Sequence, residues 1–222
     1  MTLPVWIDGP LAPAPVPPAG AIAWQVRLDD PAVEAAAGQA PLTAADLRDL
    51  ADRPDSAMRG MRRRLTRLLV ARVTGVHPAA IDIRRDALGA LHLDAPHTSG
   101  GALHGWHVSV AGRWPHCLIG LARQPVGVDL EPLDADPPPP DALTPAEARR
   151  LADAPPHAWL ACWVAKEAHA KCLGIASRIE PTGIETGAAA PGAAITAASA
   201  TGTTRGWVTT GMGTLRALAL PA

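Results

Sequence analysis

The sequence lacks tyrosine and phenylalanine altogether, so its seven tryptophans must supply all of the aromatic packing. Cysteine is scarce, and Cys117, Cys162 and Cys172 form neither a CxxC pair nor a His-rich ligand spacing. Because an odd number of cysteines argues against a disulfide framework, we expect reduced thiols and a cytoplasmic protein. No apolar run approaches the ~20 residues that span a bilayer, and the N-terminus shows no signal-peptide pattern. We therefore expect no membrane segment.

An excess of either charge is also missing, since 20 Lys and Arg stand against 21 Asp and Glu, for a formal net charge of −1. Proteins that bind nucleic acid usually carry a basic excess, so we expect no nucleic-acid partner. Hydrophobic residues make up 48% of the 222 residues. That is enough to bury a core, in one domain or in two small ones.

What the sequence does contain is a helix-length segment, WLACWVAKEAHAKCLG, at residues 159–174. Glu167 and Lys171 are four residues apart, so a helix places them on one face. The ordinary interpretation is a surface charge pair, which contributes only ~0.3–0.5 kcal/mol. The segment gains interest from a second one upstream.

This second segment, PVGVDLEP at residues 125–132, is an apolar run that reaches Asp129 and then Glu131. Residues two apart in a strand share a face, so both carboxylates project from the same side. Their repulsion is relieved by a proton or a cation. A third carboxylate from Glu167 would complete an oxygen cage suited to Mg²⁺. Lys171, one turn further along the helix, could meet a phosphate beside that metal. On residue types alone, this is a site for phosphoryl-group chemistry.

The chain also contains an internal similarity: LTAADLRDLAD at 42–52 resembles LTPAEARRLAD at 143–153. The same offset carries a strand at 24–28 toward Asp129 and an Arg-rich helix at 56–75 onto the WVAKEAHAK helix. We predict an α+β fold of two pseudo-symmetric α/β halves, each a strand–helix–helix–strands unit, with the active-site cleft between them. Chance similarity of two Ala/Leu/Arg-rich helix starts is the alternative. Since both halves of a cleft are present in one chain, we expect a monomer.

The predicted N-terminal half spans 1–104 and holds a proline-rich arm and the Arg-rich helix. The C-terminal half spans 105–222 and holds the GVDLE and WVAKEAHAK motifs. In the N-terminal half we further predict an irregular arm at 1–20, a strand at 21–28 and two strands within 80–93, followed by a hinge at 94–105. In the C-terminal half we predict a hairpin at 106–122, a proline loop at 134–141, a weakly specified region at 175–199 and one or two strands within 203–220.

GVDLE followed by WVAKEAHAK resembles the paired signature of the 4′-phosphopantetheinyl transferases, specifically the larger pseudo-dimeric class that activates surfactin-type synthetases. The similarity extends from about Arg59 to Gly174. It implies a Mg²⁺-dependent enzyme that transfers the 4′-phosphopantetheine arm of coenzyme A to a serine of an acyl or peptidyl carrier protein. Such enzymes serve polyketide, nonribosomal peptide or fatty acid biosynthesis.

The resemblance also implies roles for individual residues. Asp129, Glu131 and Glu167 would hold Mg²⁺ together with the coenzyme pyrophosphate, with Glu167 and Lys171 acting in catalysis. Lys171 would bind a phosphate oxygen. The remaining residues implied in coenzyme binding are Lys166, Ser109, Arg59 and Arg62, with Arg63 beside them. A solvated lysine at 166 and a solvated arginine face on the long helix are the alternatives.

Glu147 falls in the segment where some family members place a base that deprotonates the carrier serine. Its alternative role is that of a carboxylate at a helix N-terminus, stabilised by the helix dipole. The sequence leaves both roles open.

Two positions depart from the family pattern. The family has Ser-His-Ser before its Gly-Arg-Trp-like turn, whereas this chain has Val110 at the histidine position. A Gly-Lys-Pro or Gly-Arg-Pro triplet is replaced by Gly89-Ala90-Leu91. Neither Val nor Ala side chains donate hydrogen bonds, and each lost charge-assisted contact is worth ~1.5–3 kcal/mol. The candidate substitutes are His104, His107 and His116.

These departures keep two other functions open. The chain could have lost normal coenzyme A binding and serve as a carrier-protein-binding protein. It could instead perform other chemistry on carrier-bound thioesters in the same cleft.

Overall fold

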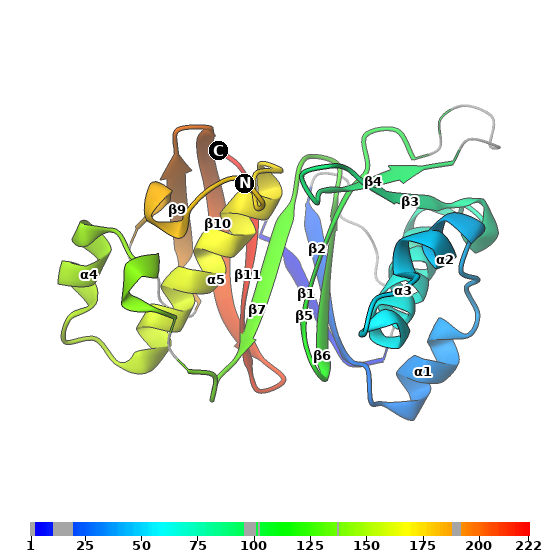
Figure 1. The fold of residues 1–222 in the computed structure, drawn as a ribbon, viewed down its shortest axis with the longest axis horizontal. Helices are drawn as coiled ribbons and strands as arrows, with labels where there is room; N and C mark the ends of the chain where they lie inside the picture. The colour runs from blue at the N-terminus through cyan, green and yellow to red at the C-terminus, as the bar shows by residue number, and fades with distance from the viewer. Residues whose placement is uncertain (1–2, 11–19, 96–100, 102, 137, 188–191) are drawn as a thin grey trace.

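The computed structural model describes residues 3–10, 20–95, 101, 103–136, 138–187 and 192–222, and its fold is mixed α+β (Figure 1). Two sheets lie against each other, and each is covered by helices on the side away from the other sheet. The predicted α+β class is confirmed. In the described part of the chain, no helix combines the length and the apolar character needed to cross a membrane.

The first sheet has the strand order β1-β2-β6-β5. Its strands are β1 (Val5–Asp8), β2 (Ala21–Arg27), β5 (His107–Arg113) and β6 (His116–Ala122). β1 runs parallel to β2, whereas the other pairs are antiparallel. The prediction of an irregular arm over 1–20 is therefore wrong at β1, where the strand-favouring residues Val5, Trp6 and Ile7 pair with β2. Residues 11–19 lie outside the described part.

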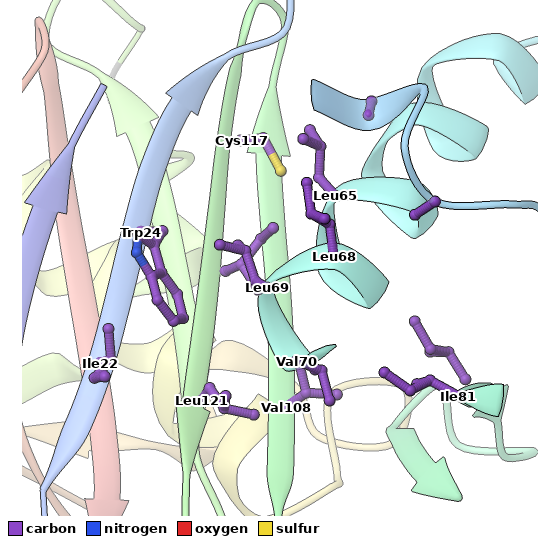
Figure 2. Close-up of a cluster of buried hydrophobic side chains, with 14 of the residues drawn as sticks. Ile22, Trp24, Leu65, Leu68, Leu69, Val70, Ile81, Val108, Cys117 and Leu121 are labelled. Carbon is purple, nitrogen blue, oxygen red and sulfur yellow. The ribbon is translucent and has the colours of Figure 1, made fainter. Parts of the chain in front are cut away.

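Three helices cover the first sheet: α1 (Pro31–Ala37), α2 (Ala44–Leu50) and α3 (Ser56–Thr74). Figure 2 shows Leu65, Leu68 and Leu69 of α3 packed toward the β2 side chains Ile22 and Trp24. α3 ends at Gly75, whose left-handed φ of 75° suits glycine at a helix C-cap. α1 was not predicted, although Asp30 caps it and Pro31 begins it.

A small hairpin extends from this layer. A 3₁₀ turn (Pro78–Ala80) leads into β3 (Asp82–Arg85), which pairs antiparallel with β4 (Leu91–Asp94). The two strands predicted within 80–93 are confirmed. The hinge predicted at 94–105 includes residues 96–100 and 102, which lie outside the described part.

The second sheet is antiparallel, in the order β7-β11-β10-β9-β8. Its strands are β7 (Gly127–Pro132), β8 (Glu185–Thr186), β9 (Ala194–Ser199), β10 (Gly202–Gly211) and β11 (Thr214–Pro221). A 3₁₀ turn (Pro140–Ala142) and α4 (Pro145–Leu151) precede α5 (Pro156–Cys172), which packs along β7, β11 and β10. A further 3₁₀ turn (Pro181–Gly183) and β9 give regular structure to the segment predicted as weakly specified.

The two sheets share an apolar core. Leu118 of β6, Val128 and Leu130 of β7 and Leu218 of β11 are fully buried between them. At Gly120 of β6, an added Cβ would lie 2.5 Å from a methyl carbon of Val128, so glycine allows the sheets to approach. Side chains of β7 that point the other way, toward α5, are therefore separated from this core.

The change from one sheet to the other falls between β6 and β7. The hairpin β5–β6 belongs to the first sheet, so the division predicted at 104/105 does not coincide with the change of sheet. The sheets also differ in strand number and in the parallel pairing of β1. The pseudo-symmetric duplication therefore stays a hypothesis.

Candidate active site

The alternation of β7 places its two carboxylates under α5. Val128 and Leu130 face the first sheet, so Gly127, Asp129 and Glu131 face the helix. At Gly127 an added Cβ would overlap the carbonyl oxygen of Ala168, which shows how closely α5 lies on the strand. Both carboxylate residues are buried, at 6% and 7% exposure. The strand that sequence analysis predicted therefore delivers its acids to a covered position.

Asp129 forms an ion pair with Lys171 of α5. The Lys171 Nζ lies 2.6 Å from Asp129 Oδ1, while Oδ2 is buried and has no hydrogen-bond partner among the described residues. Burial raises the pKa of Asp129 to about 6; Lys171 opposes this rise, whereas repulsion from Glu167 and Glu131 adds to it. Burial outweighs the ion pair because only one of the two oxygens is paired.

Glu131 is held by an arginine that sequence analysis did not single out. Arg113, at the end of β5, donates from Nε and Nη2 to both Glu131 oxygens at 2.9–3.0 Å. This hydrogen bonding raises the pKa of the arginine. Arg113 precedes the hairpin turn, and no local pattern reports its contact with a residue 18 positions later. The fork geometry fixes Glu131 firmly.

Glu167 lies one turn before Lys171 on α5 and is partly buried. Its charge acts on Asp129 and on Arg113, so the structure brings the three predicted carboxylates and Lys171 together. Within the described part of the chain, the Glu167 carboxylate has neither an ion pair nor a side-chain hydrogen bond. Of the three acids, Glu167 therefore has the fewest polar contacts in the described part of the chain.

A pocket of about 630 Å³ opens on one side of this group. Lys171 and Ser109 line it, and so do Val110 and Ala90, the two departures from the family pattern. Besides Lys171, its basic lining residues are Arg85, His92 and His107, and sequence analysis named only His107 among these three. Burial lowers the pKa of His107. Of the three histidine substitutes, the described pocket lining includes His107 but neither His104 nor His116.

A second pocket, of about 490 Å³, opens on the other side. Glu131 and Arg113 line it together with Trp114 and Trp163, the latter one turn before Glu167 on α5. Trp114 is 60% exposed, the most exposed aromatic side chain in the described part. The cluster of three carboxylates thus lies between two pockets. Lys171 lines the pocket of about 630 Å³, and Arg113 lines the pocket of about 490 Å³.

The predicted coenzyme-binding arginines lie beside the larger pocket. Arg59, Arg62 and Arg63 line a small cavity of about 150 Å³. That cavity shares Val110 and Arg85 with the larger pocket. Its arginines are partly engaged, because Arg59 bonds Asp55 and Arg63 bonds Asp49 and the Ile83 carbonyl. The Arg62 guanidinium lies against Gly112, and its Nε has no hydrogen-bond partner among the described residues.

Ser109 connects the two sheets. Its Oγ accepts a hydrogen bond of 3.1 Å from the backbone N–H of Val128, one residue before Asp129. The side chain is 7% exposed and still lines the larger pocket. Ser109 therefore aligns β5 with β7 at the site.

Glu147 and Lys166 form a pair away from both pockets. Lys166 Nζ lies 2.6 Å from Glu147 Oε2, and the residues are 1% and 0% exposed. Burial alone would raise the pKa of Glu147, but hydrogen bonds from Lys166, Thr144 and Thr186 lower it below the usual value. Glu147 also completes a capping box with Thr144 at the start of α4. This arrangement is the one expected for the helix-terminus alternative.

The donor atoms of these residues suit Mg²⁺, but their present arrangement does not form a metal site. The donors are carboxylate oxygens, and Asp129 Oδ2 is a buried acceptor without a partner. However, Lys171 engages the other oxygen of Asp129, and Arg113 engages Glu131. Among the residues that the structure describes, no three His, Cys, Asp or Glu side chains are arranged to hold a metal ion.

A comparison with protein-family models gives a match. Residues 125–208 match the family model of the 4′-phosphopantetheinyl transferase superfamily. The segment contains β7, α4, α5 and most of β10, and so Asp129, Glu131, Glu167 and Lys171. A comparison with curated protein sequences gave no match. Through this segment, the chain is similar to the 4′-phosphopantetheinyl transferase superfamily.

Proposed function

We propose that the protein transfers the 4′-phosphopantetheine arm of coenzyme A to a serine of an acyl or peptidyl carrier protein, with Mg²⁺ as the metal. One observation carries the proposal: the family segment brings three carboxylates and Lys171 together between two pockets. The larger pocket, of about 630 Å³, is of the size that holds small-molecule ligands.

We assign coenzyme A to this larger pocket. Lys171 supplies a cation at one end for a phosphate oxygen, and Arg85 and His107 line the rest. Arg59 and Arg62 in the adjoining cavity are the candidates for a further phosphate. The second pocket, with the exposed Trp114, lies where a carrier serine would approach from the opposite side of the carboxylates.

In the reaction, the serine oxygen forms a bond to the β-phosphorus of coenzyme A, and the bond from that phosphorus to the bridging oxygen breaks. The leaving group is 3′,5′-adenosine bisphosphate, and the serine proton passes to a base. Glu167 is the site carboxylate that has no ion pair in the described part of the chain, so we assign the proton to it, directly or through water. The complete burial of Glu147 beside Lys166 favours a structural role for that residue.

Asp129, Glu131 and Glu167 would hold the metal after their present cations shift. When bound, Mg²⁺ supplies positive charge against the pyrophosphate. Lys171 would orient a phosphate oxygen, Arg113 holds Glu131 in place until the metal binds, and Ser109 keeps β5 aligned with β7.

The direct test is incubation of the purified protein with coenzyme A, Mg²⁺ and unmodified carrier proteins of its own organism. Mass spectrometry should show addition of one phosphopantetheine to the carrier. Glu167→Ala should abolish it, whereas substitution of an exposed residue away from the pockets, such as Leu3→Ala, should not. Absence of the product with every carrier protein of the organism would contradict the proposal.

A second function is favoured by Val110 and Ala90, which both line the larger pocket. If they remove normal coenzyme binding, the protein binds carrier proteins, or acts on carrier-bound thioesters, without transferring the arm. Calorimetric titration with coenzyme A separates the two functions. Val110→His should tighten binding by about tenfold if the pocket holds coenzyme A, since it restores a donor worth ~1.5 kcal/mol.

A further inference from the structure

Lys171 is held to its carboxylate by fewer hydrogen bonds than Arg113, the other cation that is paired with an acid of the site. It contacts Asp129 through a single hydrogen bond of 2.6 Å, lines the 630 Å³ pocket, and its side chain is 25% exposed. It therefore has two available partners, the carboxylate beneath it and any anion in the pocket.

Lys166 has no such choice, and Arg113, although it is 62% exposed and lines the second pocket, is held by more hydrogen bonds than Lys171. Arg113 makes three hydrogen bonds to the two Glu131 oxygens, a fork that is lost only as a whole. Lys166 is 1% exposed and divides its donors between Glu147 and two backbone carbonyls. A lysine amine on a flexible stem can change partners at lower cost.

The three carboxylates are also partly neutralised by side chains of the protein. Three acids stand against two cationic side chains, and the oxygen left without a partner, Asp129 Oδ2, belongs to the acid that Lys171 holds. A divalent cation bound to Asp129 would lie close to the Lys171 ammonium group. Like charges that close repel strongly in a partly buried site.

We propose that Lys171 acts as an internal substitute for the divalent cation: it holds Asp129 in the free protein and exchanges that carboxylate for a phosphate in the larger pocket when the metal binds. The identity of the phosphate ligand rests on the proposed function, whereas the exchange itself concerns metal and protein alone. By linkage, metal binding is weak until an anion draws Lys171 away, so each ligand strengthens the other.

The first test measures metal affinity in the absence of any phosphate. Titration with Mn²⁺, followed by electron paramagnetic resonance, should show at least about tenfold tighter binding in Lys171→Met than in the wild type, because a competing cation is gone. Lys171→Gln should behave in the same way. Equal or weaker binding in both variants would overturn the proposal, because a residue that assists the metal would have that effect.

The second test needs no variant at the lysine. The chain has only two lysines, and Lys166 is 1% exposed, so Lys171 is the accessible side-chain amine. A short pulse of an acetylating reagent, read by peptide mass spectrometry, reports how strongly Asp129 shields it. Added Mg²⁺ should raise the rate several-fold, and Asp129→Asn should give the raised rate without metal.

An unchanged rate in both conditions would overturn the exchange. The proposed function fails separately: if Lys171→Met tightens Mn²⁺ binding but the wild type transfers no phosphopantetheine, the exchange stands and the transferase assignment does not. If neither protein binds Mn²⁺ at millimolar concentration, both proposals fail.

Discussion

Each half of the molecule lays one long helix on a sheet, but the strands offer those helices different surfaces. β2 presents Ile22, Trp24 and Val26 to the α3 layer, and all three are buried hydrophobics. β7 presents Gly127, Asp129 and Glu131 to α5. An apolar strand is the stabilising choice at both places, since a buried carboxylate is costly unless it is fully paired. The acids of β7 therefore stand where an apolar strand would be more stable, as expected if they serve the proposed function.

The same two halves agree closely elsewhere. In each, a threonine caps the short helix and its capping-box acid pairs with a buried base on the long helix: Asp46 with Arg67, and Glu147 with Lys166. Each base also bonds the carbonyl two residues before the capping threonine, at Pro41 and Ala142. The halves thus share their helix anchoring and differ in the strand beneath the helix.

The largest effect should come from breaking this shared anchor. Lys166→Met leaves Glu147 as an uncompensated buried charge, so we expect the free energy of unfolding to fall by about 3–5 kcal/mol. Urea denaturation measures the loss, with Arg67→Met as the matched change in the other half. The double variant Glu147→Gln/Lys166→Met should recover part of it. A loss of activity with unchanged stability would instead indicate a coenzyme contact for Lys166.

The next effect has the opposite sign. Asp129→Asn removes a buried charge with an unpaired oxygen, whose pKa burial raises to about 6. We expect the metal-free protein to gain about 1–2 kcal/mol of stability at pH 8, together with loss of activity. Thermal or urea unfolding provides the measurement. If the variant is less stable than the wild type, the Lys171 ion pair contributes more than the burial costs.

A smaller effect separates the two capping threonines. Thr43→Ala and Thr144→Ala each remove a helix N-cap, which typically costs about 1 kcal/mol. The Thr144 hydroxyl donates to Glu185 of β8, whereas the Thr43 hydroxyl donates only within its own capping box, to Asp46, so Thr144→Ala should cost more than Thr43→Ala. Equal losses in urea denaturation would show that the contact with Glu185 adds nothing.

The smallest effect concerns pH and the C-terminal half. Burial lowers the pKa of His169, which bonds Thr204 and Ser199. The unfolded chain takes up a proton near the ordinary pKa of about 6.5, while the folded protein does not, so stability should decrease as pH falls below that value. His169→Gln should reduce the slope of stability against pH without abolishing it, since burial also lowers the pKa of His107 and His116. An unchanged slope would assign the effect to other groups.

Much of this arrangement could be predicted because its signals are local. Thr43 and Thr144 each precede an acid by three residues, and a capping box begins each helix there. The period of two in GVDLE correctly placed both acids on one face. Gly75 correctly ended the long helix.

Long-range pairings could not be read in the same way. The parallel pairing of β1 with β2 joins segments that are separated in the sequence. Arg113 likewise reaches Glu131 because β5 and β7 lie side by side in the fold. The sequence suggested Glu147 and Lys166 as separate site residues, whereas the fold seals them together. Arg85 reaches the pocket through a hairpin whose placement no local pattern reveals.

The close packing of α5 on β7 also limits which substitutions the backbone at the site can accept. Gly127 has the helix backbone against one face of its strand, and Gly120 lets Val128 come equally close from the other sheet. The backbone that carries Asp129 is therefore clamped from both sides, where even one methyl group has no space. Val110 and Ala90, the two positions at which the sequence departs from the pattern that it resembles, lie in the pocket wall and not on this closely packed backbone.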